Sequence, residues 1–454
     1  MYPDDFRYNL KAFFGEKVAL DLLKSLDCDP VISIRRNPDK ISFEDLCSHF
    51  GDSINGFVPW CSDGIYLKKR PNFTLDPFFH SGVYYVQEAS SMFIESLFLY
   101  IKKDNMRILD LCAAPGGKST HICSLMSSNS ILISNEVIRS RSATLAENIA
   151  KWGKPNILVT NNDPEEFKQL DSYFDLLLVD APCSGEGMFR KDRNAVNEWS
   201  MRNVELCAAR QMRILFDIWP TLKNGGYLIY STCTFNKYEN DENIARICKE
   251  LGGEVVDIPV PDGVLRTEKG GYQFIPGRIE GEGFFCVLIR KNGELKSNFR
   301  IPKSKVKSLG SNDFIQKGYV LSLKGEMLKA YPEHLFNEMA FIESVIKMIH
   351  SGVAVATNKG KDLIPEADLA LSNIINKETF YSENVTYDES LKFLAKEPLV
   401  FNGNPKGYLL LSYKKIPIGF VKNLGSRSNN LHPQARRIRM DIHKIHEVHY
   451  SQNE

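Results

Sequence analysis

Two cysteines closely follow predicted strands and could act as nucleophiles. The apolar run 176–179 continues through Asp180 to Cys183, and the apolar run 227–230 continues to Cys233. The carboxyl ends of parallel strands meet at one edge of a sheet, which is where α/β proteins bind their ligands. A single buried cysteine is more often inert packing. Two cysteines at neighbouring strand ends instead favour a chemical role for the pair.

Upstream of both cysteines, a predicted strand at 107–111 ends in a loop of small residues that opens a helix. The loop consists of Cys112, Ala113, Ala114, Pro115, Gly116, Gly117 and Lys118. Backbone N–H groups in such a loop can closely approach an anionic or adenosine-bearing ligand. The sequence therefore predicts a nucleotide or cofactor site here.

Three interpretations of this loop compete. Its end imitates a P-loop, and the apolar strand before Asp180 imitates the strand that holds magnesium in P-loop ATPases. A P-loop needs glycine at position 112, where this sequence has cysteine, so an ATPase is a weak interpretation. A loop that serves packing alone is the second. A site for S-adenosylmethionine in a methyltransferase is the third, and the acidic residues that follow the strands favour it.

Three consecutive predicted strands are followed by carboxylates. Glu136 can accept hydrogen bonds from both ribose hydroxyls of the cofactor, as acidic residues do in other doubly wound nucleotide sites. Asp163 follows the next strand, where it can contact the adenine amino group, and Asp180 follows the one after. Any one of these carboxylates is more often a surface or capping group. Their recurrence at three strand ends predicts S-adenosylmethionine as the cofactor.

A methyltransferase with two cysteines beside its cofactor suits the methylation of an unreactive aromatic carbon. Carbon 5 of cytosine becomes nucleophilic only after a thiolate adds to carbon 6 and forms a covalent adduct. A carboxyl group near ring nitrogen 3 lowers the barrier by placing a proton there, and Asp180 is the candidate. Lys118 or a helix N-terminus could favour the thiolate. The spacing alone leaves open which cysteine attacks.

Apolar runs alternate with helical segments between residues 106 and 291, which is typical of a parallel sheet with helices on both faces. We therefore expect an α/β fold with a Rossmann-like catalytic domain at 76–291. Residues 1–75 mix helical and strand patterns and are expected to form a small α+β domain. A basic linker and intermediate α/β segment is expected at 292–381, and a separate domain with strand-like runs at 382–454.

Composition limits the range of functions. The 454 residues carry 57 Lys and Arg against 56 Asp and Glu, a net charge of +1, which excludes a strongly basic nucleic-acid binder as a description of the whole chain. Local basic stretches at 291–307 and 403–454 still allow an RNA partner, and the second has nine basic against three acidic residues.

Other features of the sequence predict where the protein works. The chain has neither a signal-peptide pattern nor an apolar stretch long enough for a membrane helix, so we expect a cytoplasmic protein without membrane contact. The ten cysteines include no C-x-x-C pair, and we expect no metal site.

The sequence resembles the Sun-type RNA cytosine-5 methyltransferases, and within them the bacterial enzymes of small-subunit ribosomal RNA. The stretches that carry this resemblance are 84–92, 112–118, 135–137, 180–185, 222–226, 231–233 and 278–285. The N-terminal segment is similar through 33–38. The C-terminal segment is more weakly similar, through 407–411 and 416–422, to a PUA-like RNA-binding module.

The resemblance implies roles for individual residues. Cys233, in the Thr-Cys motif, is expected to be the nucleophile, and Cys183, in the Pro-Cys motif, is expected to assist release of the methylated RNA. Glu136, Asp163 and Asp180 fall on the acidic contacts of the cofactor. One departure is Asn224, where family members often have proline, and we expect it to matter little.

The resemblance also implies that the substrate is RNA, namely 16S ribosomal RNA or an assembling small ribosomal subunit, and that the protein acts as a monomer. The target base must be splayed out of its helix or loop to reach the cysteine. Two alternatives stay open at this point. The substrate could be a cytosine in tRNA, or the chain could be a non-catalytic RNA-binding ribosome-assembly factor on a methyltransferase scaffold.

Overall fold

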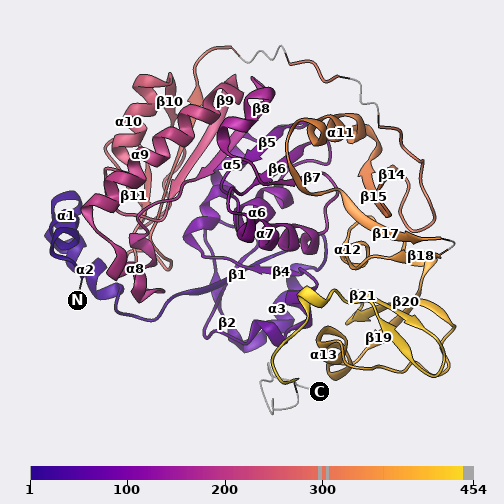
Figure 1. Cartoon of the computed structure of the whole chain (residues 1–454). Helices are drawn as coiled ribbons and strands as arrows, with labels where there is room; N and C mark the ends of the chain where they lie inside the picture. Colours follow the sequence, from indigo (N-terminus) through magenta and orange to yellow (C-terminus); the bar gives the residue numbers. More distant parts are fainter. Residues whose placement is uncertain (1, 295–298, 303–305, 361, 443–454) are drawn as a thin grey trace.

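The computed structural model describes residues 2–294, 299–302, 306–360 and 362–442, and it contains four sheets (Figure 1). The remaining residues, 295–298, 303–305 and 443–454 among them, lie outside this description, and with them parts of both predicted basic stretches. Within the described residues, no helix is both long and apolar enough to cross a bilayer.

The N-terminal segment contributes a four-stranded sheet in the order β2-β3-β1-β4. Its strands are β1 (Ile32–Arg36), β2 (Ile54–Phe57), β3 (Gly64–Leu67) and β4 (Tyr84–Val86), and its helices are α1 (Asp4–Phe14), α2 (Glu16–Ser25), α3 (Phe43–Phe50) and α4 (Pro77–His80). The helices α1 and α2 pack away from this sheet. Phe6 and Leu22 share a hydrophobic cluster with Phe189 and Trp199, so the two helices lie against the central part of the chain, at the left of Figure 1.

The central sheet has ten strands in the order β11-β12-β13-β9-β8-β5-β6-β7-β16, with β10 paired to β13. These strands are β5 (Arg107–Asp110), β6 (Ile131–Asn135), β7 (Ile157–Thr160), β8 (Phe174–Asp180), β9 (Leu222–Thr232), β10 (Gly253–Val256), β11 (Leu265–Arg266), β12 (Tyr272–Phe274), β13 (Phe284–Lys291) and β16 (Met348–Ser351). The five strands from β7 to β9 are parallel, and β13 joins β9 antiparallel. This arrangement confirms the predicted α/β fold class. The chain order reverses between β5 and β8, which is where such sheets open a ligand crevice.

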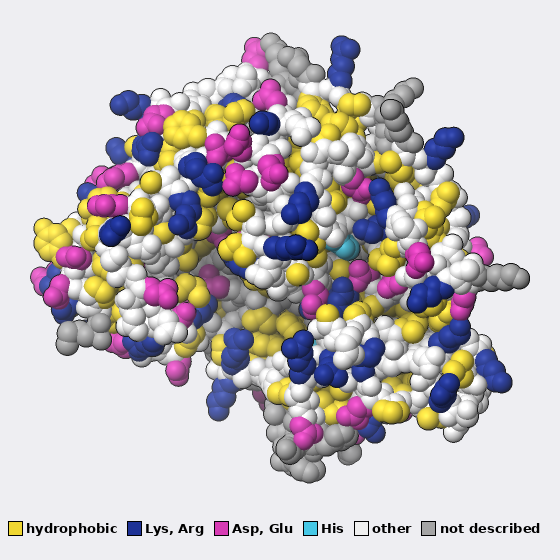
Figure 2. All heavy atoms as spheres, viewed as in Figure 1, with side chains coloured by type: hydrophobic (Ala, Val, Ile, Leu, Met, Phe, Trp, Pro, Cys, Tyr) yellow, Lys and Arg dark blue, Asp and Glu magenta, His cyan; other side chains and the backbone are white. Residues whose placement is uncertain are grey.

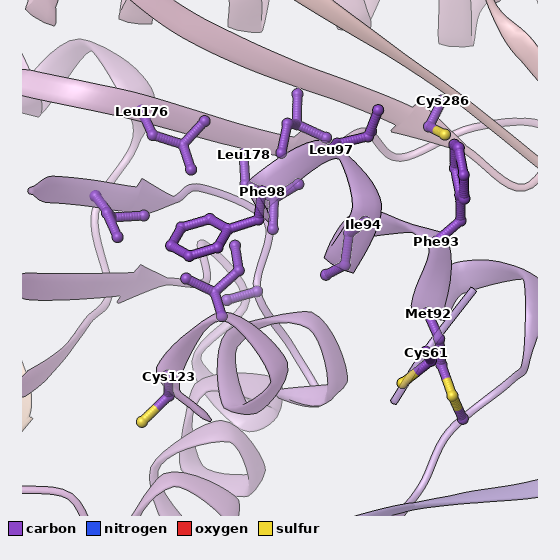
Figure 3. Close-up of a cluster of buried hydrophobic side chains, with 14 of the residues drawn as sticks. Cys61, Met92, Phe93, Ile94, Leu97, Phe98, Cys123, Leu176, Leu178 and Cys286 are labelled. Atoms are coloured by element: carbon purple, nitrogen blue, oxygen red, sulfur yellow. The ribbon is translucent and has the colours of Figure 1, made fainter. Parts of the chain in front are cut away.

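Helices cover both faces of this sheet because side chains alternate along each strand. They are α5 (Ile94–Ile101), α6 (Gly117–Leu125), α7 (Arg139–Trp152), α9 (Met201–Ile218), α10 (Asp241–Glu250) and α11 (Phe336–Val345). The short helix α8 (Arg193–Glu198) instead packs with α1 and α2. Ile108 packs with α5, α6 and α7 on one face, whereas its neighbour Leu109 packs with α9, α10 and α11 on the other. Figure 3 shows the first face, where Leu97 and Phe98 of α5 lie against Leu176 and Leu178 of β8.

The C-terminal third adds two four-stranded sheets, drawn in orange and yellow in Figure 1. One contains β14 (Tyr319–Lys324), β15 (Met327–Pro332), β17 (Val353–Lys359) and β18 (Asp362–Pro365), and the other β19 (Tyr381–Val385), β20 (Gly407–Tyr413), β21 (Ile416–Asn423) and β22 (Ser428–Asn430), with helices α12 (Ala367–Leu371) and α13 (Tyr387–Ala395). Between β15 and β17 the chain leaves the third sheet. There it places α11 on the central sheet and β16 antiparallel to β7, with Met348 opposite Thr160.

A buried ion pair ties α11 to the centre of the fold. Arg107 Nε and Nη2 each lie 2.5 Å from a carboxylate oxygen of Glu338, and the Tyr173 hydroxyl donates to the same carboxylate at 2.6 Å. The side chains of Arg107 and Glu338 are only 11% and 8% exposed, so neither charge can be solvated if its partner is lost.

We expect Glu338→Ala to lower the free energy of unfolding by about 3–5 kcal/mol, the usual cost of leaving one buried charge unpaired. Urea denaturation followed by circular dichroism measures this loss. The exposed neighbour Glu333 provides the matched control, and Glu333→Ala should stay within about 0.5 kcal/mol of the wild type. A loss below about 1 kcal/mol for Glu338→Ala would show that α11 is not part of the cooperative core.

Candidate active site

A cavity of about 930 Å³ opens at the carboxyl edge of the central sheet. Its walls come from the ends of β5, β8 and β9 and, opposite them, from segments that follow α2, β3 and β4. Figure 2 shows a hollow on this face between the lobe that carries α1, α2 and α8 and the surface over β1 and β4. The predicted cofactor loop lines this cavity through all its residues except Gly116.

The loop between β5 and α6 is held from behind by side chains of α7. Arg141 donates to the Ala114 carbonyl and Asn148 to the Pro115 carbonyl, both at 2.8 Å. Gly116 has a φ of 115°, in the left-handed region that favours glycine. With its carbonyl groups bound on the outside, the loop presents the start of α6 to the cavity, and helix N-termini attract negative or electron-rich groups.

Asp110, at the end of β5, is a cavity residue that the sequence did not single out. It is fully buried, Ser119 donates to its Oδ2 at 2.6 Å, and its Oδ1 has no hydrogen-bond partner among the described residues. Burial raises the pKa of this carboxyl to about 7. A buried acceptor without a partner beside a cavity fits a ligand that brings a cation or a donor. Its apolar setting at a strand end was the one available signal.

The structure does not bring Glu136 and Asp163 into this cavity. Glu136 is buried after β6, where its Oε1 accepts from the Ile138 N–H at 2.9 Å. Asp163 caps the 3₁₀ helix Pro164–Leu170, accepting from the Glu165 N–H at 3.3 Å, which is the ordinary capping role of such a residue. Both residues nevertheless follow strands on the same sheet edge as the loop, one and two strands away from it.

Asp180 ends β8 at the cavity wall with both carboxylate oxygens bound. Lys118 Nζ donates to Oδ2 at 2.8 Å, and the Ser231 hydroxyl donates to Oδ1 at 2.7 Å. Burial would lower the pKa of the Lys118 ammonium, but the Asp180 carboxylate raises it above its usual value. The cofactor loop and the two cysteine-bearing strands are therefore joined through one carboxylate.

The structure brings the two cysteines into contact. Their sulfur atoms lie 3.1 Å apart, and the Cys233 N–H donates to Cys183 Sγ at 3.3 Å. Cys233 lines the cavity, whereas Cys183 is not among the lining residues. The hydrogen bond to Cys233, together with burial, raises the pKa of the Cys183 thiol well above its usual value. Cys183 is therefore a protonated thiol behind a cysteine that faces the cavity.

Two buried carboxylates support the loops that carry these cysteines, and no pattern in the sequence indicated them. Glu239 accepts from the Ser184 N–H at 3.0 Å and from the Asn236 side chain at 2.8 Å. Glu186 accepts from the Phe235 and Asn236 N–H groups at 2.8 and 3.0 Å. Glu186 follows Cys183 and binds the loop after Cys233, whereas Glu239 follows Cys233 and binds the loop after Cys183. The two cysteine loops are therefore joined by hydrogen bonds around the sulfur–sulfur contact.

One group of side chains among the described residues could in principle ligate a metal, namely Cys61, Glu95 and His121. All three are buried, and none of them lines the cavity. Glu95 accepts from His121 Nε2 at 2.8 Å and from the Ser62 hydroxyl at 2.8 Å. These contacts link the loop before β3 to α5 and α6 and need no ion to explain them.

Comparison with solved structures identifies the fold class. A solved structure of a methyltransferase homolog from Pyrococcus horikoshii is 28% identical, with a TM-score of 0.56, over 64% of this chain and 95% of that one. A second structure from that organism, described as NSun6 with SFG, covers 64% of this chain at a TM-score of 0.56, and at 22% identity it shows the fold alone. Fold and site thus define a Rossmann-like methyltransferase.

Three family models match the chain: the N-terminal domain of 16S rRNA methyltransferase RsmF at 2–89, the 16S rRNA methyltransferase RsmB/F family at 97–290, and the methyltransferase RsmF PUA domain at 384–438. The ribosomal RNA small subunit methyltransferase F of Shewanella baltica is 31% identical over 88% of this chain and 89% of its own length. That of an Escherichia coli O7:K1 strain is 30% identical over 95% and 96%. The chain belongs to the RsmF family, which confirms the resemblance seen in the sequence and the predicted N-terminal and PUA-like regions.

The raised pKa of Asp110 predicts how unfolding depends on pH. Its folded pKa of about 7 lies above the ordinary value of 3.8, so Asp110 contributes stability below pH 4 that is lost as the pH rises through 7. Asp110→Asn removes this titration. Its stability relative to the wild type, without ligand, should therefore increase by about 2–3 kcal/mol between pH 5 and pH 8. Urea unfolding at both pH values measures the change, and an offset independent of pH would contradict it.

Proposed function

We propose that the protein is an S-adenosylmethionine-dependent RNA methyltransferase that forms 5-methylcytosine in 16S ribosomal RNA. One observation carries the proposal. Cys233 and the loop 112–118 line the same cavity, with the sulfur of Cys183 3.1 Å behind that of Cys233. A methyl donor and a cytosine that share this cavity would have a thiol beside the pyrimidine ring.

The described residues fit the cofactor. A cavity of about 930 Å³ has room for a cofactor and an extruded base, since single drug-sized ligands occupy roughly 300–1,000 Å³. The unpartnered Asp110 Oδ1 suits the ammonium group of the methionine part, and the loop 112–118 suits its carboxylate. Glu136 and Asp163 follow the next two strands on the same sheet edge, outside the cavity lining. From that edge, Glu136 would hold the ribose and Asp163 the adenine amino group. When bound, S-adenosylmethionine supplies the electrophilic methyl group.

Cys233 is the proposed nucleophile and Cys183 the residue that assists release. The raised pKa of Cys183 keeps a proton on that sulfur, which lets Cys183 donate a hydrogen bond to the sulfur of Cys233. A thiolate at Cys233 would then be stabilised by this bond and by the nearby Lys118 ammonium. The position of the two sulfurs also favours Cys233 as the nucleophile, because Cys233 lines the cavity and Cys183 does not.

Residues of the candidate site would take part in the addition and elimination steps of this reaction. The Cys233 thiolate adds to carbon 6 of cytosine while a proton passes from the Lys118 ammonium through Asp180 to nitrogen 3, which makes carbon 5 nucleophilic. Nitrogen 3 returns this proton along the same path when the adduct breaks down. After methylation a base takes the carbon 5 proton, the carbon–sulfur bond breaks, and the thiolate is regenerated. Asp180 is fixed for its task by Lys118 and Ser231, and Cys183 lies beside the leaving sulfur.

Charge at the mouth of the cavity supports RNA as the substrate. Lys68, Lys69 and Arg70 follow β3 directly, are exposed and line the cavity, and Lys191 lines it as well. No carboxylate of the described residues lies within ion-pair distance of the first three. We call these four residues the basic rim. In Figure 2, Lys and Arg side chains stand along the lower edge of the hollow. A phosphate backbone needs positive charge only where it lies.

The choice of 16S ribosomal RNA, rather than tRNA, rests on two relatives named ribosomal RNA small subunit methyltransferase F. The chain aligns with 89% and 96% of their lengths. The match at 384–438 to a PUA domain of that family supports a second RNA contact remote from the cavity. We propose that the enzyme acts as a monomer in the cytoplasm, on the RNA or on the assembling small subunit.

Exchange of the cysteines tests the chemistry. Cys183→Ala should accumulate a protein–RNA adduct that survives denaturing gel electrophoresis, because addition still occurs while release is slowed. Cys233→Ala should give no such band. The reaction uses 16S ribosomal RNA with S-adenosylmethionine, and the adduct is detected by its retarded migration and by loss of the band after ribonuclease treatment.

Cys28 offers the matched control, since it is exposed and is not itself among the residues that line the cavity, and Cys28→Ala should behave as the wild type. An adduct with Cys233→Ala and none with Cys183→Ala would exchange the two roles. The absence of an adduct in every variant, with methylation intact in Cys183→Ala, would contradict the covalent mechanism.

Removal of charge tests the basic rim. The double variant Lys68→Ala/Lys69→Ala should weaken RNA binding about tenfold at 0.1 M salt and flatten the slope of log K against log salt by roughly 1.5–2, as expected for two lost phosphate contacts. Its affinity for S-adenosylmethionine should not change. Filter binding of RNA at several salt concentrations measures the RNA affinity and its salt slope.

The control variant is Lys102→Ala/Lys249→Ala, which removes the same charge at two exposed lysines outside the cavity. An equal loss of RNA affinity in both double variants would show that net charge, and not the basic rim, governs binding.

A further inference from the structure

The segment between the catalytic and PUA matches contacts the residues that follow β7, beside Glu136. The family models cover 97–290 and 384–438, and β16 with the residues before it lies between them in the chain. In the fold, β16 pairs with β7, so the turn at 346–347 comes to lie against the residues that follow β7. These are Asn161 and Asn162, directly before Asp163.

The Lys347 backbone is hydrogen-bonded to Asn161 and Asn162 much as one strand is to its neighbour. The Lys347 N–H donates to Asn162 Oδ1 at 3.1 Å, and the Asn162 side-chain amide donates to the Lys347 carbonyl at 3.0 Å. The Asn161 N–H donates to the same carbonyl at 3.3 Å. The side chain of Asn162 thus extends the β7–β16 ladder beyond the last residue of β7.

The Lys347 side chain continues the contact toward Glu136. Its Nζ donates to Asn161 Oδ1 at 3.1 Å, and the Asn161 amide nitrogen donates to the carbonyls of Glu136 and Val137 at 2.7 and 2.9 Å. These bonds fix the orientation of the amide, because the lysine requires an oxygen and the two carbonyls require a nitrogen.

Burial makes this chain of hydrogen bonds effective. Asn161 is 8% and Glu136 3% exposed, so the amide acts in a medium of low dielectric constant, where hydrogen bonds in series strengthen one another. The ammonium at one end polarises the amide and strengthens its bonds to the two carbonyls. Lys347 itself is exposed and loses little hydration.

We propose that Lys347 is a positioning residue for S-adenosylmethionine, acting through Asn161 on the backbone that carries Glu136. This inference rests on the proposed function, in which Glu136 holds the ribose of the cofactor. It gives the segment 336–351 a part in cofactor binding, beyond the RNA contacts expected of the C-terminal region. Lys347 contacts Asn161 and Asn162 and not the proposed sites of the methyl group or the cytosine ring. Its loss should therefore lower the affinity for the cofactor and leave the rate of the chemical step unchanged.

Replacement of Lys347 tests the inference through the kinetic constants of the full-length protein. Lys347→Ala should raise both the Kd and the KM for S-adenosylmethionine about threefold to tenfold, the effect of one hydrogen bond of intermediate strength. The kcat at saturating cofactor and the KM for 16S ribosomal RNA should stay within about twofold of the wild type. Lys347→Arg, which keeps a charged donor, should recover most of the affinity. Isothermal titration gives the Kd, and methyl incorporation gives the other constants.

Lys359 provides the matched control, because it is an exposed lysine at the end of β17, in the third sheet and not in the central one. Lys359→Ala should leave all four constants unchanged. If Lys347→Ala binds the cofactor as tightly as Lys359→Ala does, or if its loss falls on kcat or on the RNA, the inference is wrong. Wild-type protein that fails to bind S-adenosylmethionine would overturn the proposed function, and this inference with it.

Discussion

The parallel pairing of β8 with β9 places Asp180 opposite Ser231, and the candidate site depends on that register. Three residues beyond Asp180 is Cys183, and two residues beyond Ser231 is Cys233, so both thiols leave the sheet at the same height. A shift of the register by one residue would turn every side chain of one strand to the opposite face and would separate the sulfurs. The hydrogen bond from Ser231 to Asp180 closes the end of this pair.

Buried polar side chains around the two cysteines hold this register. Glu186 and Glu239 accept hydrogen bonds from the loops that follow the two strands. Lys118 joins the end of β8 to the cofactor loop through its bond to Asp180. Buried polar networks of this kind are costly unless each group is satisfied, but when satisfied they favour one arrangement of the loops. Asp110 Oδ1 is one of several buried polar atoms without a hydrogen-bond partner among the described residues, and it lies where the cofactor is proposed to bind.

Much of this could be predicted from the order of residues, because strand ends, small-residue loops and cysteines are local features. The alternation of apolar runs and helices indicated the parallel sheet. The loop Cys112 to Lys118, apart from Gly116, lines one cavity together with Asp180 and Cys233. The sequence could not reveal contacts between distant segments. Glu239 and Glu338 look like ordinary surface glutamates in the sequence, and only the folded chain brings them to Ser184 and Arg107. Likewise, the sequence did not show that the Asp163 carboxylate caps a 3₁₀ helix, and its contact with the cofactor stays a prediction.

The central claim is that this pair of thiols, beside one cavity, methylates carbon 5 of cytosine in 16S ribosomal RNA. The most direct measurement supplies the wild-type protein with S-adenosylmethionine carrying a ¹³C-labelled methyl group and with 16S ribosomal RNA, as free RNA and as small subunits. The RNA is then digested to nucleosides for mass spectrometry. The account predicts that the label appears in 5-methylcytidine. Label in a ribose methyl group, or in any base other than cytosine, would contradict it.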